Sequence, residues 1–301
     1  MKLSKWLIIL VLTTGILAIS TSATLIRLAS QSAFRSGVEF SLVIAASRVA
    51  IASLLLVPTW PKIKWKNLPP GAIIYGAAAG VCLAAHFALW TTSLSYTSIA
   101  ASTTLVTTNP IWVAFLSWWC LKERLSRQTI IGIVVAMAGG LMIGLADIGG
   151  TTPGSNSLLG NFLALMGAWT SSLYIFLGYR ARTKGFSIGG YIVVVYTIAA
   201  ILLLPIPFIF GVGYSGHSGS VYFYLLLIGL LPQLIGHTSI NWAMGWVSPT
   251  FVTLAVALFE PVGASFLGYL FFGEVPSLII LLGIVILLIG VAVAVLGSPQ
   301  K

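Results

Sequence analysis

The hydrophobic residues of this chain form long uninterrupted runs, which turn residues and short charged clusters separate. Each run is about 20 residues long, the length that a helix needs to cross the hydrocarbon core of a bilayer. A transmembrane barrel would instead show segments of about ten residues that alternate between polar and apolar. The pattern predicts an all-α membrane protein with ten transmembrane helices, at residues 6–28, 40–60, 68–93, 98–120, 127–146, 158–179, 189–212, 220–244, 249–272 and 276–296.

The composition agrees with a membrane protein. Of the 301 residues, 58% are hydrophobic and only 7% are charged, whereas a soluble domain carries about 25% charged residues. In lipid every backbone polar group must be paired internally, which helices achieve. The first run follows Lys2 and Lys5 and also resembles a signal peptide. We favour a retained helix, because it completes the repeat described below.

Positive charge sets the predicted orientation, because cytoplasmic loops of membrane proteins are rich in Lys and Arg. With a cytoplasmic N-terminus, twelve of the 15 basic residues fall on the cytoplasmic side, and only Arg27 and Arg35 fall outside. An even number of spans returns the C-terminus to the cytoplasm. We therefore expect a multi-pass protein of the plasma membrane with both termini inside. Since the basic clusters serve topology, the net charge of +10 does not indicate nucleic-acid binding.

The sequence contains a duplication at an offset of 151 residues. The landmark pairs are His86 and His237, Pro110 and Pro261, Glu123 and Glu274, Gly132 and Gly283, and Gly139 and Gly290. The offset spans five helices, so the two halves must insert in opposite orientations. Inverted repeats of this kind are typical of secondary transporters. We expect a first five-helix repeat at residues 1–146, a linker at 147–157 and a second five-helix repeat at 158–301.

Several motifs carry a resemblance to a known family. They are Ser95–Ser98, Asn109–Trp112 and Leu121–Arg124 in the first half and Phe259–Val262 and Phe271–Glu274 in the second, together with Arg48, Gly283 and Gly290. With these motifs the chain resembles the drug/metabolite transporter superfamily, EamA type, over nearly its whole length. The resemblance implies a ten-helix carrier whose central cavity is lined by both halves. The resemblance also implies a relation to exporters of amino acids and metabolites, and to carriers of nucleobases or drugs.

Glu260 is the main candidate for a functional residue. It lies near the middle of the ninth predicted span, where an ionisable group is costly and needs a role or a partner. It could carry a proton or pair with a substrate cation; a structural ion pair with Arg48, itself expected to be a structural charge, is the alternative. The first half has Asn109 at the matching position, so the duplicated site is chemically asymmetric. Pro110 and Pro261 follow these two residues and are expected to bend their helices.

The eighth predicted span carries Gln233, His237 and Asn241 at spacings of four residues. On an α-helix these residues share one face, and a polar face in a membrane helix turns toward the protein interior. In the first half His86 and Trp90 occupy the positions that match His237 and Asn241. These side chains are candidates for a substrate cavity, and the histidines also for proton coupling. Interhelical hydrogen bonds that serve packing are the alternative.

Aromatic residues in mid-span extend the predicted cavity. Trp169 and Tyr174 lie away from the predicted interfaces, so we expect them to line the cavity with Trp90 rather than to form an interfacial belt. The two cysteines, Cys82 and Cys120, lie inside apolar runs and indicate neither a disulfide nor a metal site. We therefore expect no metal and no cofactor.

The sequence indicates a secondary transporter of a small metabolite, most simply an exporter of amino acids or related solutes that works by alternating access. The chain has no P-loop motif for ATP, and neither a catalytic motif nor paired acids indicate an enzyme. Whether protons drive transport is left open. A non-transporting membrane scaffold and a nucleobase or drug carrier are the alternatives. The expected partners are a small-molecule substrate and the bilayer, not nucleic acid, with the protein monomeric or weakly dimeric.

Overall fold

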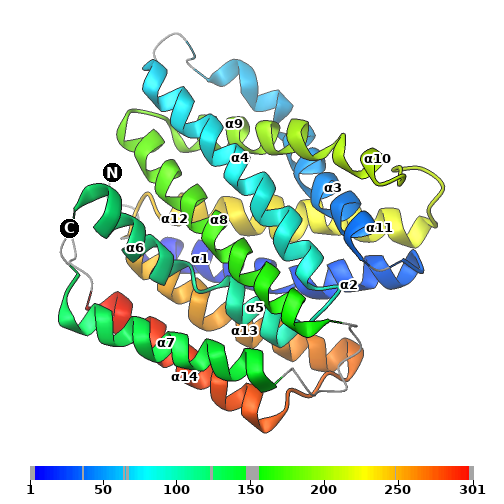
Figure 1. Ribbon diagram of the computed structural model, residues 1–301. Coiled ribbons are helices and arrows are strands. Elements are labelled where there is room, and N and C mark those ends of the chain that lie inside the picture. Colours follow the sequence, from blue (N-terminus) through cyan, green and yellow to red (C-terminus); the bar gives the residue numbers. More distant parts are fainter. Residues whose placement is uncertain are drawn as a thin grey trace.

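The computed structural model describes residues 4–35, 37–63, 65, 68–122, 125–146, 156–247 and 249–297. These residues form a bundle of helices without strands (Figure 1). The helices are α1 (Lys5–Ser20), α2 (Ser22–Ser32), α3 (Val38–Leu56), η1 (Val57–Lys62), α4 (Pro70–Ser93), α5 (Ile99–Val106), α6 (Asn109–Leu121), α7 (Arg127–Ala146), α8 (Ser157–Thr183), α9 (Ile188–Leu203), α10 (Ile206–Ile209), α11 (Gly219–Ile228), η4 (Gly229–His237), α12 (Thr238–Ala243), α13 (Pro249–Phe272) and α14 (Leu278–Leu296). Of these, η1 is a 3-10 helix and η4 is a π-helix.

The prediction of an all-α membrane protein is confirmed. Nine stretches of the described residues are long and apolar enough to cross a membrane, and the stretch Arg127–Ile143 of α7 is a shorter apolar helix. Some predicted runs consist of helices in line: α1 and α2 form the first run, α5 and α6 the fourth, and α11, η4 and α12 the eighth. Glu123 and most of the predicted linker, residues 147–155, lie outside the described residues.

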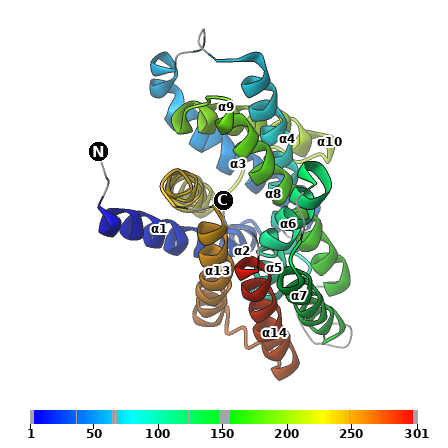
Figure 2. The same ribbon diagram turned by 90° about the vertical axis from the view of Figure 1, so that its left-hand side faces the viewer.

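The last helices of the two halves, α7 and α14, pack side by side at one edge of the bundle (Figure 1, Figure 2). A Cβ atom on Gly132 would lie 2.6 Å from the carbonyl oxygen of Gly290, and one on Gly139 would lie 2.6 Å from that of Gly283. Residue numbers rise along α7 as they fall along α14, so the two helices are antiparallel. Small residues allow backbones to approach this closely. Matching helices that run in opposite directions are what an inverted duplication requires.

We expect Gly290→Ala to destabilise the protein. The new methyl group would overlap the backbone nitrogen of Ala136 on α7, so the two helices would have to separate. Extra atoms in a close contact typically cost about 1–3 kcal/mol, which thermal unfolding in detergent detects as a lower melting temperature. Gly140→Ala is the matched control, because its methyl group would only touch two leucine side chains at 3.7 Å. An equal loss of stability in this control would contradict the close-contact explanation.

The bundle has two ends, which α8 connects. Near the start of α8, Gly160 packs against Thr97 at one end of the bundle. Its last turn carries Arg180 and Arg182, about 33 Å away for a helix that rises 1.5 Å per residue. Figure 1 shows the start of α1 and the end of α14 at the same end of the bundle as the last turn of α8. We call this the Arg182 end, and the opposite one the Glu274 end.

Candidate functional site

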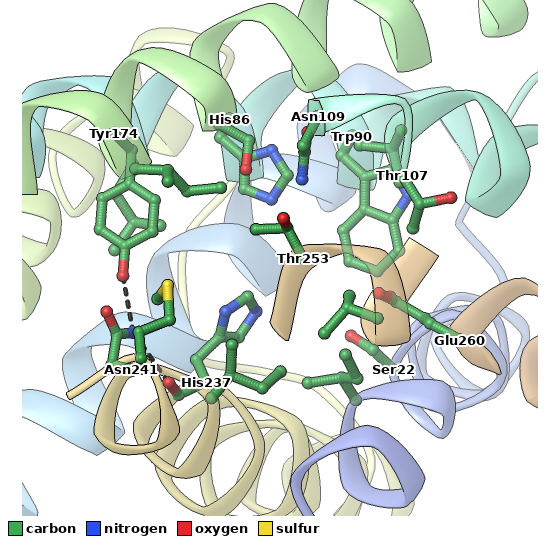
Figure 3. Close-up of a pocket in the computed structure, with 18 residues that line it drawn as sticks. Ser22, His86, Trp90, Thr107, Asn109, Tyr174, His237, Asn241, Thr253 and Glu260 are labelled. Atoms are coloured by element: carbon green, nitrogen blue, oxygen red, sulfur yellow. Dashed lines mark hydrogen bonds between the residues drawn. The ribbon is translucent and has the colours of Figure 1, made fainter. Parts of the chain in front are cut away.

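A cavity lies inside the bundle between the two halves (Figure 3). The space open to the centres of water molecules is about 70 Å³, enough for a few waters. Its walls come from α1, α2, α4, α5 and α6 of the first half and from α8, η4, α12 and α13 of the second. The polar and aromatic side chains that line it are Ser22, His86, Trp90, Thr107, Asn109, Ser171, Tyr174, His237, Asn241, Thr253 and Glu260. The two halves therefore share one chamber.

Glu260 is the only charged residue among the described side chains that line the cavity. It lies near the middle of α13 and is 9% exposed. Within the described part of the chain, its carboxylate accepts no hydrogen bond and pairs with no cation. In Figure 3 it lies on the opposite side of the cavity from Tyr174 and Asn241. A buried carboxylate in this setting is available to a proton or to a cationic group that enters the cavity.

The two histidines that the repeat places at matching positions both line the cavity. The His86 ring lies parallel to that of Trp90, with an angle of 2° between the planes and 6.1 Å between the centroids. The His86 Nδ1 atom donates to the Gly167 carbonyl at 2.9 Å, which leaves Nε2 of the neutral ring as an acceptor. His237, at the end of η4, packs edge to face with Phe87 at 5.4 Å. The rings of His86, Trp90 and His237 therefore all contribute to the lining of the cavity.

Asn109 lies at a break between α5, which ends at Val106, and α6, which begins at Asn109 itself. The Asn109 side-chain amide is oriented so that both its oxygen and its nitrogen have suitable partners. In this orientation Nδ2 donates to the carbonyl oxygens of Val106 at 2.9 Å and Ala168 at 3.2 Å. The break coincides with the bend expected at Pro110, which has no N–H to donate to the preceding turn. In the second half, by contrast, α13 continues as a helix through Pro261. The two halves thus differ in backbone as well as in charge.

Tyr174 and Asn241 form a hydrogen-bonded pair at one side of the cavity (Figure 3). The Asn241 Nδ2 atom donates to the Tyr174 hydroxyl oxygen at 2.8 Å and to the His237 carbonyl at 2.8 Å. Both side chains of the pair are buried. Because Tyr174 belongs to α8 and Asn241 to α12, the pair links two helices of the second half across the edge of the cavity.

Arg48 is fully buried behind the cavity wall and does not line the cavity. Its guanidinium carbon lies 3.9 Å from the centroid of the Phe87 ring. Its Nε atom donates to Gln233 Oε1 at 3.0 Å, and Nη1 donates to Ser22 Oγ at 3.3 Å. Among the described residues no ion pair joins it to Glu260. Contacts from three other helices suit the structural role expected of this cation.

Two of the residues expected in the cavity lie elsewhere. Gln233 is fully buried but faces Arg48. It belongs to η4, whose π-type turns each contain about one more residue than α-type turns, so a spacing of four no longer keeps it in line with its neighbours. Trp169 on α8 packs against Trp112, with ring centroids 5.5 Å apart, and against Phe115 at 6.2 Å. Neither of these two side chains is among the residues that line the cavity in this structure.

The cavity also contains hydroxyl groups that were not predicted. They belong to Ser22, Thr107, Ser171 and Thr253. Ser and Thr in membrane helices commonly bond to their own backbone, and Thr107 does so by donating to the Thr103 carbonyl at 2.9 Å. The sequence carries no signal that separates such residues from those that also face a cavity.

A second pocket, which we call the vestibule, adjoins the cavity toward the Arg182 end. It encloses about 450 Å³. Its lining residues are Ile175, Gly178, Tyr179, Arg182, Thr183, Phe186, Ser187, Ile188, Tyr191, Asn241 and Met244. Ile175, Asn241 and Met244 also line the cavity, so these side chains and the Tyr174–Asn241 pair form the partition between the two spaces.

The Glu274 end is held together by a cluster that we call the Arg27–Glu274 latch. Arg27 forms an ion pair with Glu274 and donates to the carbonyl oxygens of Leu94 at 3.1 Å and Thr97 at 2.9 Å. The Glu274 carboxylate also accepts a hydrogen bond from the backbone N–H of Ile99 at 3.0 Å. The latch ties α2 to the connection before α5 and to the connection after α13. Sequence spacing gave no signal for this pair, because its members lie in different halves.

Comparison with known proteins assigns the family. The EamA-like transporter family matches residues 4–145 and 158–296. "Uncharacterized transporter" of Clostridium kluyveri is 26% identical over 80% of this chain and 78% of that protein. "Uncharacterized transporter YdfC" of Bacillus subtilis is 28% identical over 64% of this chain, and the match spans 61% of that protein.

The fold has been seen in a solved structure. One crystal structure superposes with a TM-score of 0.62 at 19% sequence identity and covers 97% of this chain and 98% of that chain. A likeness at this level of identity concerns the fold alone. The family match, however, covers both repeats and most of the length. This multi-pass membrane protein belongs to the EamA-like transporter family.

Proposed function

We propose that the protein is a secondary transporter that moves a small solute across the membrane by alternating access, with the cavity as its binding site. The observation that carries this proposal is a chamber shared by two inverted halves, in which Glu260 is buried without a partner among the described residues. Similar halves in opposite orientations can exchange roles, which yields states that open to opposite sides. Transport would follow the gradient of the solute or of a coupled ion.

An amino acid or a related small amine is the solute that we propose. Glu260 supplies a negative charge for an ammonium group, and the rings of Trp90, His86 and Tyr174 supply apolar and π contacts. The open space of about 70 Å³ is smaller than the roughly 300–1,000 Å³ of typical ligand pockets, so the cavity must widen on binding, and a small solute is favoured. A proton bound to Glu260 in exchange for the ammonium group would couple transport to protons.

We further propose that both termini lie in the cytoplasm of a cell whose plasma membrane holds the protein. The Arg182 end, which also carries Arg180 and Lys184, then faces inward, as the enrichment of basic residues in cytoplasmic loops favours. In this orientation the vestibule lies on the cytoplasmic side of the cavity, while the Arg27–Glu274 latch holds the outer end together. Such a state loads its solute from the cytoplasm, as an exporter requires.

Reconstitution into liposomes tests the function. Purified protein is assayed with a panel of labelled amino acids and nucleobases, with and without a pH gradient. We expect saturable flux of at least one amino acid. Flux of nucleobases alone would favour the alternative carrier, for which the parallel rings of His86 and Trp90 offer a stacking surface. Folded protein that moves no solute under any gradient would contradict transport and favour the scaffold.

A further inference from the structure

Arg182 takes no part in the cycle described so far, although it is the only charged residue among the described side chains that line the vestibule. It lies in the last turn of α8 and is partly buried. Its Nη1 atom reaches the Asn241 carbonyl oxygen at 3.4 Å, and no carboxylate in the described part of the chain pairs with it. A guanidinium has five N–H donors, so most of those of Arg182 are available to a molecule in the vestibule.

We propose that the vestibule is a first binding site, in which Arg182 holds the carboxylate of the solute before the solute enters the cavity. The proposal rests on the proposed transport function and narrows its substrate class to carboxylate-bearing solutes. The planar fork of an arginine binds a carboxylate through two parallel, charge-assisted hydrogen bonds. The rings of Tyr179, Phe186 and Tyr191 line the same space, and they offer apolar surface to the side chain of the solute.

The charges of the two spaces are complementary to a zwitterion. The vestibule holds the cation Arg182 and the cavity holds the carboxylate Glu260. A solute with only an ammonium group is repelled at the first site, and a solute with only a carboxylate is repelled at the second. An amino acid meets a favourable charge at both. Because the Tyr174–Asn241 pair and Met244 lie between the two spaces, the sites are filled in succession, and this pair opens between the two steps.

The test measures binding at the vestibule apart from the cavity. Binding of each of the twenty common amino acids to the full-length Glu260→Gln protein in lipid nanodiscs is measured by equilibrium dialysis, because this variant weakens the cavity site and leaves the vestibule intact. Adding Arg182→Gln is expected to weaken binding of the best amino acid about tenfold or more, the loss typical of a charge-assisted hydrogen bond. Arg182→Lys is expected to retain part of the affinity. The carboxamide analogue of that amino acid carries only the ammonium charge, so Arg182→Gln is expected not to weaken its binding.

The matched control is Arg180→Gln in the same background. Arg180 lies in the same turn and carries the same charge, but its guanidinium lies 5.8 Å from the Tyr75 ring and does not line the vestibule. An equal loss of binding in this control would show a surface-charge effect and overturn the proposal. So would the absence of amino-acid binding, or binding that Arg182→Gln leaves unchanged. Flux without Arg182-dependent binding would overturn only the vestibule site, whereas such binding without flux would overturn only the proposed transport.

Discussion

Transport by the Glu260→Gln variant in proteoliposomes is expected to fall by about 10- to 100-fold relative to wild type, since a hydrogen bond to a charged group contributes about 1.5–3 kcal/mol. Glutamine has nearly the same shape, but it neither neutralises a cation nor takes up a proton. Glu260 is the only charged group among the described side chains that line the cavity, so no neighbour there replaces it. The measurement is the initial rate of solute uptake across a range of pH values.

Stability separates a loss of function at Glu260 from a loss of folding. The carboxylate is buried and accepts no hydrogen bond within the described residues, and a buried charge without a partner destabilises a fold. We therefore expect the melting temperature of Glu260→Gln to equal or exceed that of wild type. Glu39→Gln serves as the control, because Glu39 lies in the first turn of α3 and not at the cavity. A Glu260→Gln variant with wild-type rates at every pH would show that Glu260 is structural.

The transmembrane helices could be predicted from the sequence because the thickness of the bilayer fixes their length. A predicted run at 98–120 corresponds to a candidate span at Ile99–Cys120, and one at 276–296 to α14 at Leu278–Leu296. The inversion of the halves followed from an odd number of helices per repeat, and the antiparallel contact of α7 and α14 agrees with it. Breaks inside a span were harder to predict. Pro232 lies within the eighth span, but a proline alone does not predict that the backbone forms the π-helix η4.

The sequence could predict those residues of the candidate site that are polar and lie in the middle of a transmembrane helix. Glu260, His86, His237 and Asn241 line the cavity because a polar side chain in lipid must turn inward. Depth does not reveal toward which inner neighbour a side chain turns, however, so the contact of Gln233 with Arg48 could not be predicted. The vestibule and the latch depend on side chains brought together from distant segments, which no local spacing records.

In the proposed transport cycle, the contacts of the latch influence the equilibrium between the two states. Arg27 and Glu274 join the two halves at the Glu274 end, and the two side chains are 18% and 17% exposed, so solvent screens their attraction only in part. Arg27 also bonds to two backbone carbonyls of the first half. Opening the bundle at this end has to break these interactions together. In the proposed alternating-access cycle, the latch therefore favours the state that is open toward the vestibule.

Arg27→Gln is expected to shift the protein toward the state that is open at the Glu274 end. Val256 lines the cavity. The substitution Val256→Cys, made in a protein without Cys82 and Cys120, therefore reports on this state. Labelling of the introduced cysteine by a membrane-impermeant maleimide added to intact cells should become about tenfold faster, which corresponds to about 1.4 kcal/mol in the equilibrium between the two states.

Glu274→Gln should raise the labelling rate as Arg27→Gln does, and the double variant should add little, because both changes remove one shared interaction. Arg35→Gln is the control: Arg35 follows α2 near the same end, yet it belongs to no ion pair among the described residues. Labelling that stays at the wild-type rate in both latch variants would mean that the ion pair does not bias the cycle. Labelling that rises equally with Arg35→Gln would point to the charge of the outer surface instead, because only the latch variants break the contact between the halves.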